Sequence, residues 1–174
     1  MVMNKGTRTL TLSALFTALS LIMLYIASVW PTGQLGLVAV ASLFIAAVVV
    51  ESGPGSGLSV FVAVSGLGML IIPNKTAPLL FLMFFGYYPV VKSLIERIGA
   101  MPLQWLLKLL VFNASLTAIR FLLKSIVFEF GGYKPGVFLL YLLGNVVFAV
   151  FDYGFSKVIW LYISRVSKFN RAKR

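Results

Sequence analysis

The fold is decided first by residues 10–30, which read LTLSALFTALSLIMLYIASVW. This stretch carries no charged side chain, and a helix needs about 20 apolar residues to cross the hydrocarbon core of a bilayer. It is longer than the roughly 7–15 apolar residues of a secretory signal core, and no small-residue cleavage site leads from it into polar sequence. We therefore predict a membrane-spanning helix here rather than a cleaved signal.

Composition extends the same conclusion to the whole chain. Of its 174 residues, 60% are hydrophobic and 11% are charged, whereas a soluble domain averages about 45–50% apolar and about 25% charged residues. The apolar runs are continuous and do not alternate with polar residues as barrel strands do. Only helices and closed barrels satisfy their own backbone groups in lipid. The sequence therefore predicts an all-α integral membrane protein of the cell membrane.

The apolar runs divide into about six segments that occupy nearly the whole chain. This favours a single compact transmembrane domain over residues 1–174. Prolines such as Pro31 and Pro73 mark turns between segments, and the stretch Gly53–Gly57 is interpreted as a flexible turn. Pro89 is expected to kink the segment that contains it. The predicted helices are 8–30, 35–50, 58–72, 76–95, 102–128 and 136–166.

Basic residues predict how the chain is oriented. With both termini in the cytoplasm, nine lysines and arginines fall on the inner side and two on the outer side. Inner loops of membrane proteins carry such an excess, and an even number of helices is needed to place both basic termini inside. The inner set is Lys5, Arg8, Lys92, Arg97, Arg165, Lys168, Arg171, Lys173 and Arg174, and the outer set is Lys75 and Lys134.

Several classes of chemistry are disfavoured. The chain has no cysteine and no histidine, which removes thiol and imidazole catalysis and most zinc and haem sites. The glycine-rich stretch lacks the lysine of a nucleotide-binding loop, so ATP hydrolysis would need a partner. We expect no enzyme activity, cofactor or metal. Membrane orientation explains the net charge of +11 better than a nucleic-acid partner does.

Charged and amide side chains inside the predicted helices carry the most information. A charge at bilayer depth costs roughly 2.5–3.5 kcal/mol on insertion scales. If the last two helices are antiparallel neighbours, the rise of about 1.5 Å per residue places Asp152 near the depth of Lys108, and Asn145 near Asn113. We interpret Lys108 and Asp152 as a structural ion pair. A proton or ion relay is the alternative, although a relay usually needs more titratable groups in line.

Arg120 and Lys124 are spaced four residues apart and therefore share a helix face. They lie in the outer third of the fifth segment, where they either snorkel to headgroups or line an outward cavity for an anionic or carboxylate-bearing solute. Aromatic residues such as Trp30 and Tyr141 lie at the same level. They form either an interface belt or a stacking surface for a flat ligand. A belt explains Tyr87 less well, because it lies toward the middle of its segment.

Small residues on the first helix provide a further pattern. Ala14 and Ala18 lie four residues apart on one face, which serves either ordinary packing or docking onto another membrane subunit. A six-helix chain of this length with this early AxxxA pattern resembles the substrate-binding S component of energy-coupling factor (ECF) transporters. The resemblance implies that this face meets a transmembrane coupling subunit driven by two cytoplasmic ATPases.

The resemblance also implies a function and a region for the site. S components capture vitamins or other micronutrients in an outward cavity that is commonly lined by helices four to six and the loop after helix one. The cation pair and the aromatic cluster, taken with this function, predict a small solute that is anionic or carboxylated and partly flat. By region, the candidate binding residues are Trp30, Gln34, Tyr87, Arg120, Lys124, Tyr141 and Asn145.

A non-transporting scaffold is the alternative function. Small polytopic proteins that resemble the MreD cell-shape subunit would use the same helices and basic ends to hold protein partners. In that case each polar residue has its structural role only. A cell-wall synthesis protein that co-purifies with the chain, with no bound small molecule, would favour this alternative.

Overall fold

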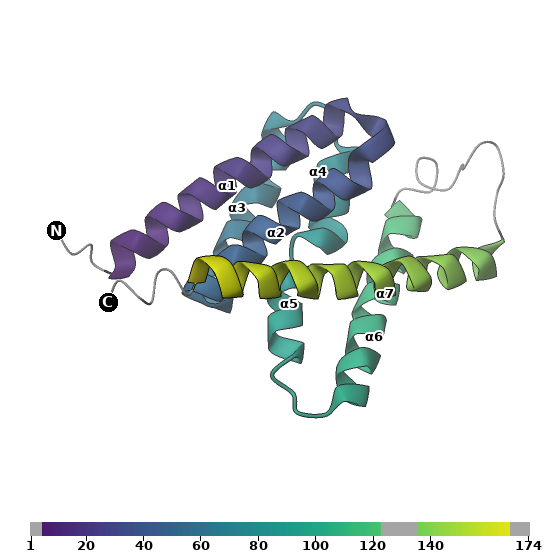
Figure 1. The fold of residues 1–174 in the computed structure, drawn as a ribbon. Coiled ribbons are helices and arrows are strands. Elements are labelled where there is room, and N and C mark those ends of the chain that lie inside the picture. Colours follow the sequence, from purple (N-terminus) through teal and green to yellow (C-terminus); the bar gives the residue numbers. More distant parts are fainter. Residues whose placement is uncertain (1–4, 123–135, 168–174) are drawn as a thin grey trace. The chain divides into compact units, whose positions relative to one another are not determined.

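The computed structural model describes residues 5–122 and 136–167, and every element within these ranges is helical (Figure 1). No strand occurs in the described part of the chain. The helical class predicted from the sequence is therefore confirmed. The elements are α1 (Lys5–Val29), η1 (Pro31–Gly33), α2 (Gln34–Ser52), α3 (Pro54–Ile71), α4 (Thr76–Leu80), η2 (Phe81–Phe85), α5 (Tyr88–Ile95), α6 (Met101–Leu122), α7 (Val137–Tyr162) and η3 (Ile163–Ser167).

Six helices among the described residues are long and apolar enough to cross a membrane. Their number agrees with the prediction, and most of their ends fall within a few residues of the predicted ones. The fourth span combines α4, η2 and α5. The six spans are Gly6–Val29, Gln34–Ser52, Pro54–Ile71, Thr76–Ile95, Met101–Phe121 and Phe138–Arg165.

The connection between α2 and α3 is tighter than the sequence suggested. The predicted flexible turn over Gly53–Gly57 is wrong, because α3 begins at Pro54 and only Gly53 lies outside the two helices. Gly53 adopts φ 89° and ψ 169°, a conformation that is almost restricted to glycine. Proline suits the first turn of a helix because its missing N–H is not needed there. One residue therefore makes the whole bend.

The described residues group into two compact units. The first contains residues 5–94 together with 159–167, and the second contains residues 95–122 and 136–158. Each unit is described separately below. The single bundle inferred from the sequence stays a prediction.

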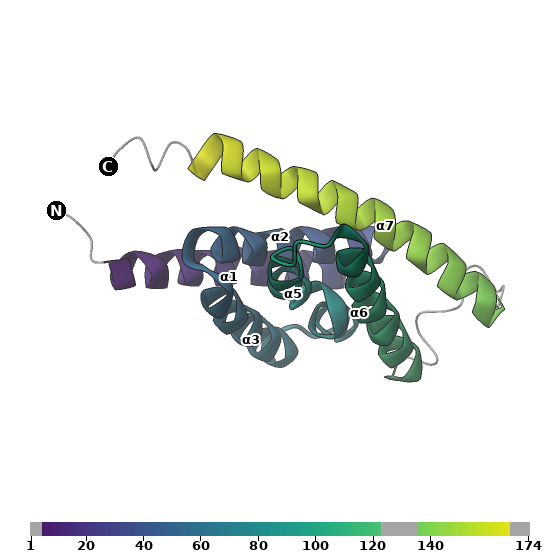
Figure 2. The same cartoon turned by 90° about the horizontal axis from the view of Figure 1, so that it is seen from below.

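In the first unit, α1, α2 and α3 pack against one another, and both ribbon views show these three helices together (Figures 1 and 2). Leu24, Val38 and Ile45 are fully buried in this unit. The hydroxyl of Ser20 donates to the carbonyl of Ala41 at 3.1 Å and ties α1 to α2. Alanine and serine along α2 let the helices approach closely, as small residues do in membrane bundles.

The fourth span is interrupted rather than simply kinked at Pro89. The π-helical turn η2 lies between α4 and α5, and the Gly86 N–H donates to the Phe81 carbonyl at 2.7 Å, five residues earlier. Pro89 lies in the first turn of α5, where its missing N–H is not needed. Aromatic rings fill the interruption: the Tyr87 ring meets the edge of Phe61 with centroids 6.1 Å apart.

In the second unit, α6 and α7 cross with opposite chain directions and meet through their side chains (Figures 1 and 2). The rings of Phe112 and Phe148 stack with centroids 4.5 Å apart and planes 12° apart. Gly144 leaves room beside them, because a Cβ built there would lie 3.2 Å from a methyl carbon of Leu116. This pair of helices carries most of the polar side chains that lie at membrane depth.

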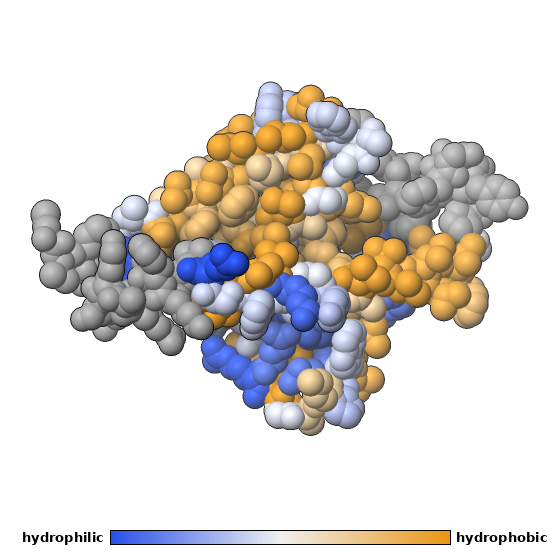
Figure 3. Space-filling model, viewed as in Figure 1, coloured by the Kyte–Doolittle hydropathy of each residue, from blue (hydrophilic) through white to orange (hydrophobic). Residues whose placement is uncertain are grey.

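The surface agrees with burial in lipid. Hydrophobic residues cover most of the visible face over α1 and α2, while hydrophilic residues gather around the end of α5 and the loop that leads to α6 (Figure 3). Large apolar side chains are exposed along the helices, such as Leu10 at 72% and Val150 at 69%. An apolar exterior of this extent is expected where lipid replaces water.

Candidate functional site between α6 and α7

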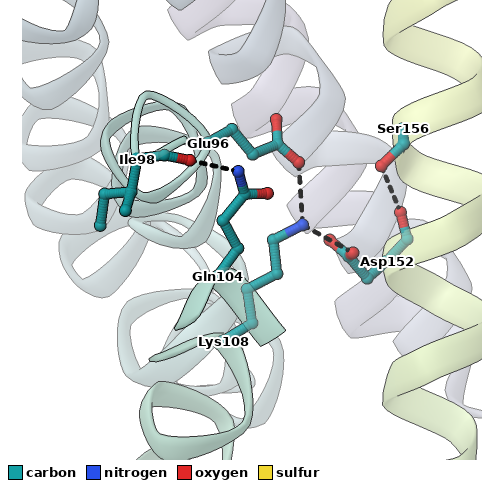
Figure 4. A network of polar contacts seen from close by, with 6 residues as sticks. All are labelled: Glu96, Ile98, Gln104, Lys108, Asp152 and Ser156. Atoms are coloured by element: carbon teal, nitrogen blue, oxygen red, sulfur yellow. Dashed lines mark hydrogen bonds and ion pairs between the residues drawn. The ribbon is translucent and has the colours of Figure 1, made fainter. Parts of the chain in front are cut away.

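A charged cluster lies between α6 and α7 (Figure 4). The Lys108 ammonium lies 2.9 Å from a carboxylate oxygen of Asp152 and 2.8 Å from one of Glu96. The Lys108 and Asp152 side chains are only 7% and 4% exposed, whereas that of Glu96 is 41% exposed. The two residues that the sequence paired are thus brought together, and Glu96 adds a carboxylate that the sequence left at a segment end.

Neighbouring contacts hold this cluster in place. The Gln104 side-chain amide donates to the Ile98 carbonyl at 2.5 Å and fixes the loop that follows Glu96 (Figure 4). The Trp105 ring lies 5.6 Å from the Lys108 nitrogen, which is within cation–π range. A buried charge is tolerated when it is paired and hydrogen-bonded in this way.

An amide pair lies further along the same two helices. The Asn113 side-chain N–H donates to the Asn145 side-chain oxygen at 2.9 Å, and the Asn145 N–H donates back at 3.1 Å. Each amide also donates to the carbonyl four residues earlier in its own helix, Leu109 for Asn113 and Tyr141 for Asn145, at 2.8 and 2.7 Å. Both amides are therefore fixed in orientation.

A hydroxyl pair forms the next step. The hydroxyls of Thr117 and Tyr141 lie 2.7 Å apart. A step of four residues along α6, from Asn113 to Thr117, is matched by four residues back along α7, from Asn145 to Tyr141. We call these three pairs the polar ladder: Lys108–Asp152, Asn113–Asn145 and Thr117–Tyr141.

Burial changes along the polar ladder. Lys108 and Asp152 are buried, Asn113 and Asn145 are half-buried, and Thr117 is exposed. The end at Thr117 is therefore accessible while the end at Lys108 is closed. The stacked rings of Phe112 and Phe148 lie between the amide pair and the ion pair in sequence on both helices.

Of the predicted binding residues in this unit, Tyr141 and Asn145 lie on the polar ladder. Arg120 follows Thr117 by three residues on α6 and is half-buried, and no described residue forms an ion pair with it. Lys124 lies outside the described residues. The shared face predicted for Arg120 and Lys124 stays a prediction.

The remaining three predicted binding residues belong to the other unit. Trp30 is 65% exposed, as an interface aromatic would be, and Gln34 is half-buried at the start of α2. Tyr87 lies in the aromatic filling of the interrupted fourth span. Within that unit, Trp30 and Tyr87 share no hydrogen bond or ring contact among the described residues.

The structure also shows where the small residues of the first helix and two of the predicted loop cations lie. Ala14 and Ala18 are both exposed on α1. Lys75 donates to the carbonyls of Met69 and Ile72 at 2.5 and 2.7 Å and so closes the end of α3. Lys92 is predicted from the sequence to be one of the inner cations. It lies in α5, and only 2% of it is exposed.

Sequence reasoning also missed a polar cluster in the first unit. A carboxylate oxygen of Glu51 lies 3.2 Å from the Arg8 guanidinium, and the Tyr162 hydroxyl donates to the other oxygen at 3.4 Å. Glu51 ends an apolar segment, and no partner for it could be predicted from the sequence. The charge of Glu51 was the one sequence feature that could have indicated a partner, because an acid next to an apolar run needs a cation or a donor nearby.

The described residues contain no group of three or more acidic residues that could hold a metal ion. The chain matches no protein-family model, no curated protein and no solved structure.

Proposed function

We propose that the chain is a membrane-embedded capture subunit of a micronutrient importer, with the polar ladder as the surface that contacts the solute. The observation that carries the proposal is the concentration of ionisable, amide and hydroxyl side chains between α6 and α7. Such residues are expensive at bilayer depth and usually mark substrate or ion pathways. The rest of the exposed surface of α6 and α7 is largely apolar, so the polar side chains of these helices are concentrated in the polar ladder.

The accessible end of the polar ladder favours a small polar solute. In this proposal the solute enters beside Thr117 and Tyr141, and Arg120 attracts its anionic group. The guanidinium can offer two parallel donors to a carboxylate. The closed end at Lys108 and Asp152 stops the solute from passing through without a further conformational step.

The proposal includes a partner that supplies energy. The chain lacks a nucleotide-binding loop, so a separate transmembrane coupling subunit with cytoplasmic ATPases would drive release. Both termini are proposed to be cytoplasmic. The exposed face of Ala14 and Ala18 is the proposed contact with the coupling subunit, because small residues allow helices to pack closely.

Native mass spectrometry of the purified chain tests the proposal. Protein from cells grown in vitamin-rich medium is expected to carry a stoichiometric small molecule, which denaturation releases for identification. Chain that remains empty under these conditions, and after incubation with a vitamin mixture, would contradict the capture function.

Variants of one cation sharpen this test. Arg120→Leu is expected to weaken solute binding at least about tenfold, because a charge-assisted hydrogen bond contributes about 1.5–3 kcal/mol. Lys157→Leu is the matched control: it also removes one cation, but Lys157 contacts the Tyr153 ring and lies off the polar ladder. Equal affinity in both variants would remove Arg120 from the binding surface.

A second function is favoured by a different observation. The three pairs of the polar ladder satisfy one another, and α1 exposes a face that suits a protein partner. These features fit a non-transporting membrane scaffold as well. An empty chain that co-purifies with a cell-wall synthesis protein would support the scaffold instead of the capture subunit.

A further inference from the structure

We infer that the Asn113–Asn145 pair is the recognition element of the solute site, and that the solute carries an N–H donor and a C=O acceptor side by side on a flat ring. Cyclic amides, imides, ureides and pyrimidine-type bases have such an edge. The inference rests on the capture function proposed above and names the chemical class of its solute.

Hydrogen bonds within each helix orient the two carboxamides so that they can bind such an edge. A side-chain amide has two N–H hydrogens and one carbonyl oxygen. In both residues one hydrogen is used within the helix, on the carbonyl of Leu109 or of Tyr141. Each amide therefore presents its other N–H and its oxygen across the space between α6 and α7, where the two form reciprocal bonds of 2.9 and 3.1 Å.

A ligand with the matching edge can keep both hydrogen bonds of the amide that it faces. It accepts from the side-chain N–H of one asparagine and donates to the oxygen of the same residue, as the other asparagine does in the free protein. A ring with two such edges satisfies both residues. This exchange matters at membrane depth, because a polar group that loses its partner there finds no water to replace it.

The surroundings suit a flat ring. The stacked rings of Phe112 and Phe148 adjoin the pair in sequence on both helices, and the hydroxyls of Thr117 and Tyr141 follow one turn away on the other side. Both asparagines are half-buried rather than sealed. Apolar rings and hydroxyls within one turn of an amide pair are typical of sites that orient a small ligand.

The test uses uracil as the probe and 1,3-dimethyluracil as its matched control, which has the same ring but no N–H. Binding to the full chain in phosphatidylcholine–phosphatidylglycerol nanodiscs is measured by ligand-observed saturation-transfer NMR, with empty nanodiscs as the blank. We expect binding of uracil to be about tenfold tighter than that of dimethyluracil, since two neutral hydrogen bonds are lost. Equal responses from the two probes would overturn the inference without any variant of the protein.

Variants of the two asparagines test whether these residues cause the preference for uracil over dimethyluracil. Asn113→Leu and Asn145→Leu should each abolish the preference for uracil. Thr11→Val, which removes a hydroxyl that bonds only within α1, should leave it unchanged. A preference that persists in both asparagine variants would overturn the inference.

Native mass spectrometry of the same samples separates the two levels of the proposal. A retained solute that lacks an amide-type edge, or that both asparagine variants keep, overturns the recognition element and leaves the capture function standing. A wild-type chain that retains no solute and ignores uracil removes the capture function itself, and the pair then serves only to hold α6 against α7.

Discussion

The paired residues of the polar ladder are stable at membrane depth because each meets a partner on the other helix. Lys108 lies between two carboxylates, and Asn113 lies against Asn145. Transfer of an unpartnered charge out of water costs far more than a neutral hydrogen bond returns. Single substitutions in these pairs should therefore cost more than double ones.

Asp152→Leu should lower the free energy of unfolding by about 3–5 kcal/mol, because it removes the buried partner of Lys108. The double variant Lys108→Met with Asp152→Leu should lose much less, since no charge of the pair is left behind. Glu96→Gln should cost less than about 1 kcal/mol, because that carboxylate is 41% exposed and exposed pairs contribute little. Denaturant unfolding in mixed micelles measures all three, and a double variant as unstable as the single one would contradict the argument.

Two glycines offer a matched comparison of packing. A Cβ at Gly86 would lie 2.6 Å from Phe61 and 2.7 Å from Phe81, whereas one at Gly66 meets nothing within 4 Å. Gly86→Ala should therefore destabilise the protein by about 1–3 kcal/mol through overpacking. Gly66→Ala should be neutral or stabilising by up to about 1 kcal/mol, because alanine favours helix. Thermal unfolding in detergent measures the difference, and equal effects would mean that the rings around Gly86 move aside.

Residue pairing could be predicted where depth alone decides it. Counting residues along two antiparallel helices placed Asp152 beside Lys108 and Asn145 beside Asn113, and the structure brings both pairs together. The role of Glu96 could not be read in this way, because it depends on how the loop after α5 turns back toward α6. Lys75 was counted as an outer-loop cation, and nothing in the sequence indicated that its ammonium closes α3 through a local contact.

At the scale of elements, the connection between α2 and α3 is shorter than the sequence indicates. Glycine and proline marked the breaks correctly, but not the length of each break. Gly53 alone makes the bend before α3, because its positive φ reverses the chain in one residue. The fourth span was read as one helix with a kink, since its composition is apolar throughout. The π-helical turn follows from aromatic packing that the sequence pattern does not specify.

Gly53→Ala tests the importance of that bend. Its φ of 89° and ψ of 169° should make alanine cost about 1–3 kcal/mol of stability. Gly36→Ala in α2 is the control, because a Cβ there also meets nothing within 4 Å and the backbone is helical. Unfolding in detergent should separate the two variants, and similar stabilities would show that the bend can relax into another conformation.

At the scale of the whole molecule, the sequence accounted for six spans because hydropathy and length determine them. It did not determine which faces of the helices pack against one another, since lipid-facing and protein-facing positions are both apolar. A helix that is apolar on every side has no polar face to mark which side packs against its neighbours. Orientation across the membrane depends on the distribution of cations in the loops.

The predicted orientation can be tested because the chain has no native cysteine. Thr32→Cys and Gly99→Cys introduce thiols at exposed positions in connections that the six-span topology places on opposite sides. In intact cells, a membrane-impermeant maleimide should label Thr32→Cys, while Gly99→Cys should react only after permeabilisation. The reverse pattern would place both termini outside, and labelling of both in intact cells would contradict the six-span topology.

The one-residue bend at Gly53 also has a mechanical consequence. A joint of one residue keeps the adjoining ends of the two helices together. Glu51 lies two residues before the joint and holds Arg8 and Tyr162. A displacement of the start of α3 therefore also displaces Glu51. It would disturb the contacts of this carboxylate with α1 and with the end of α7.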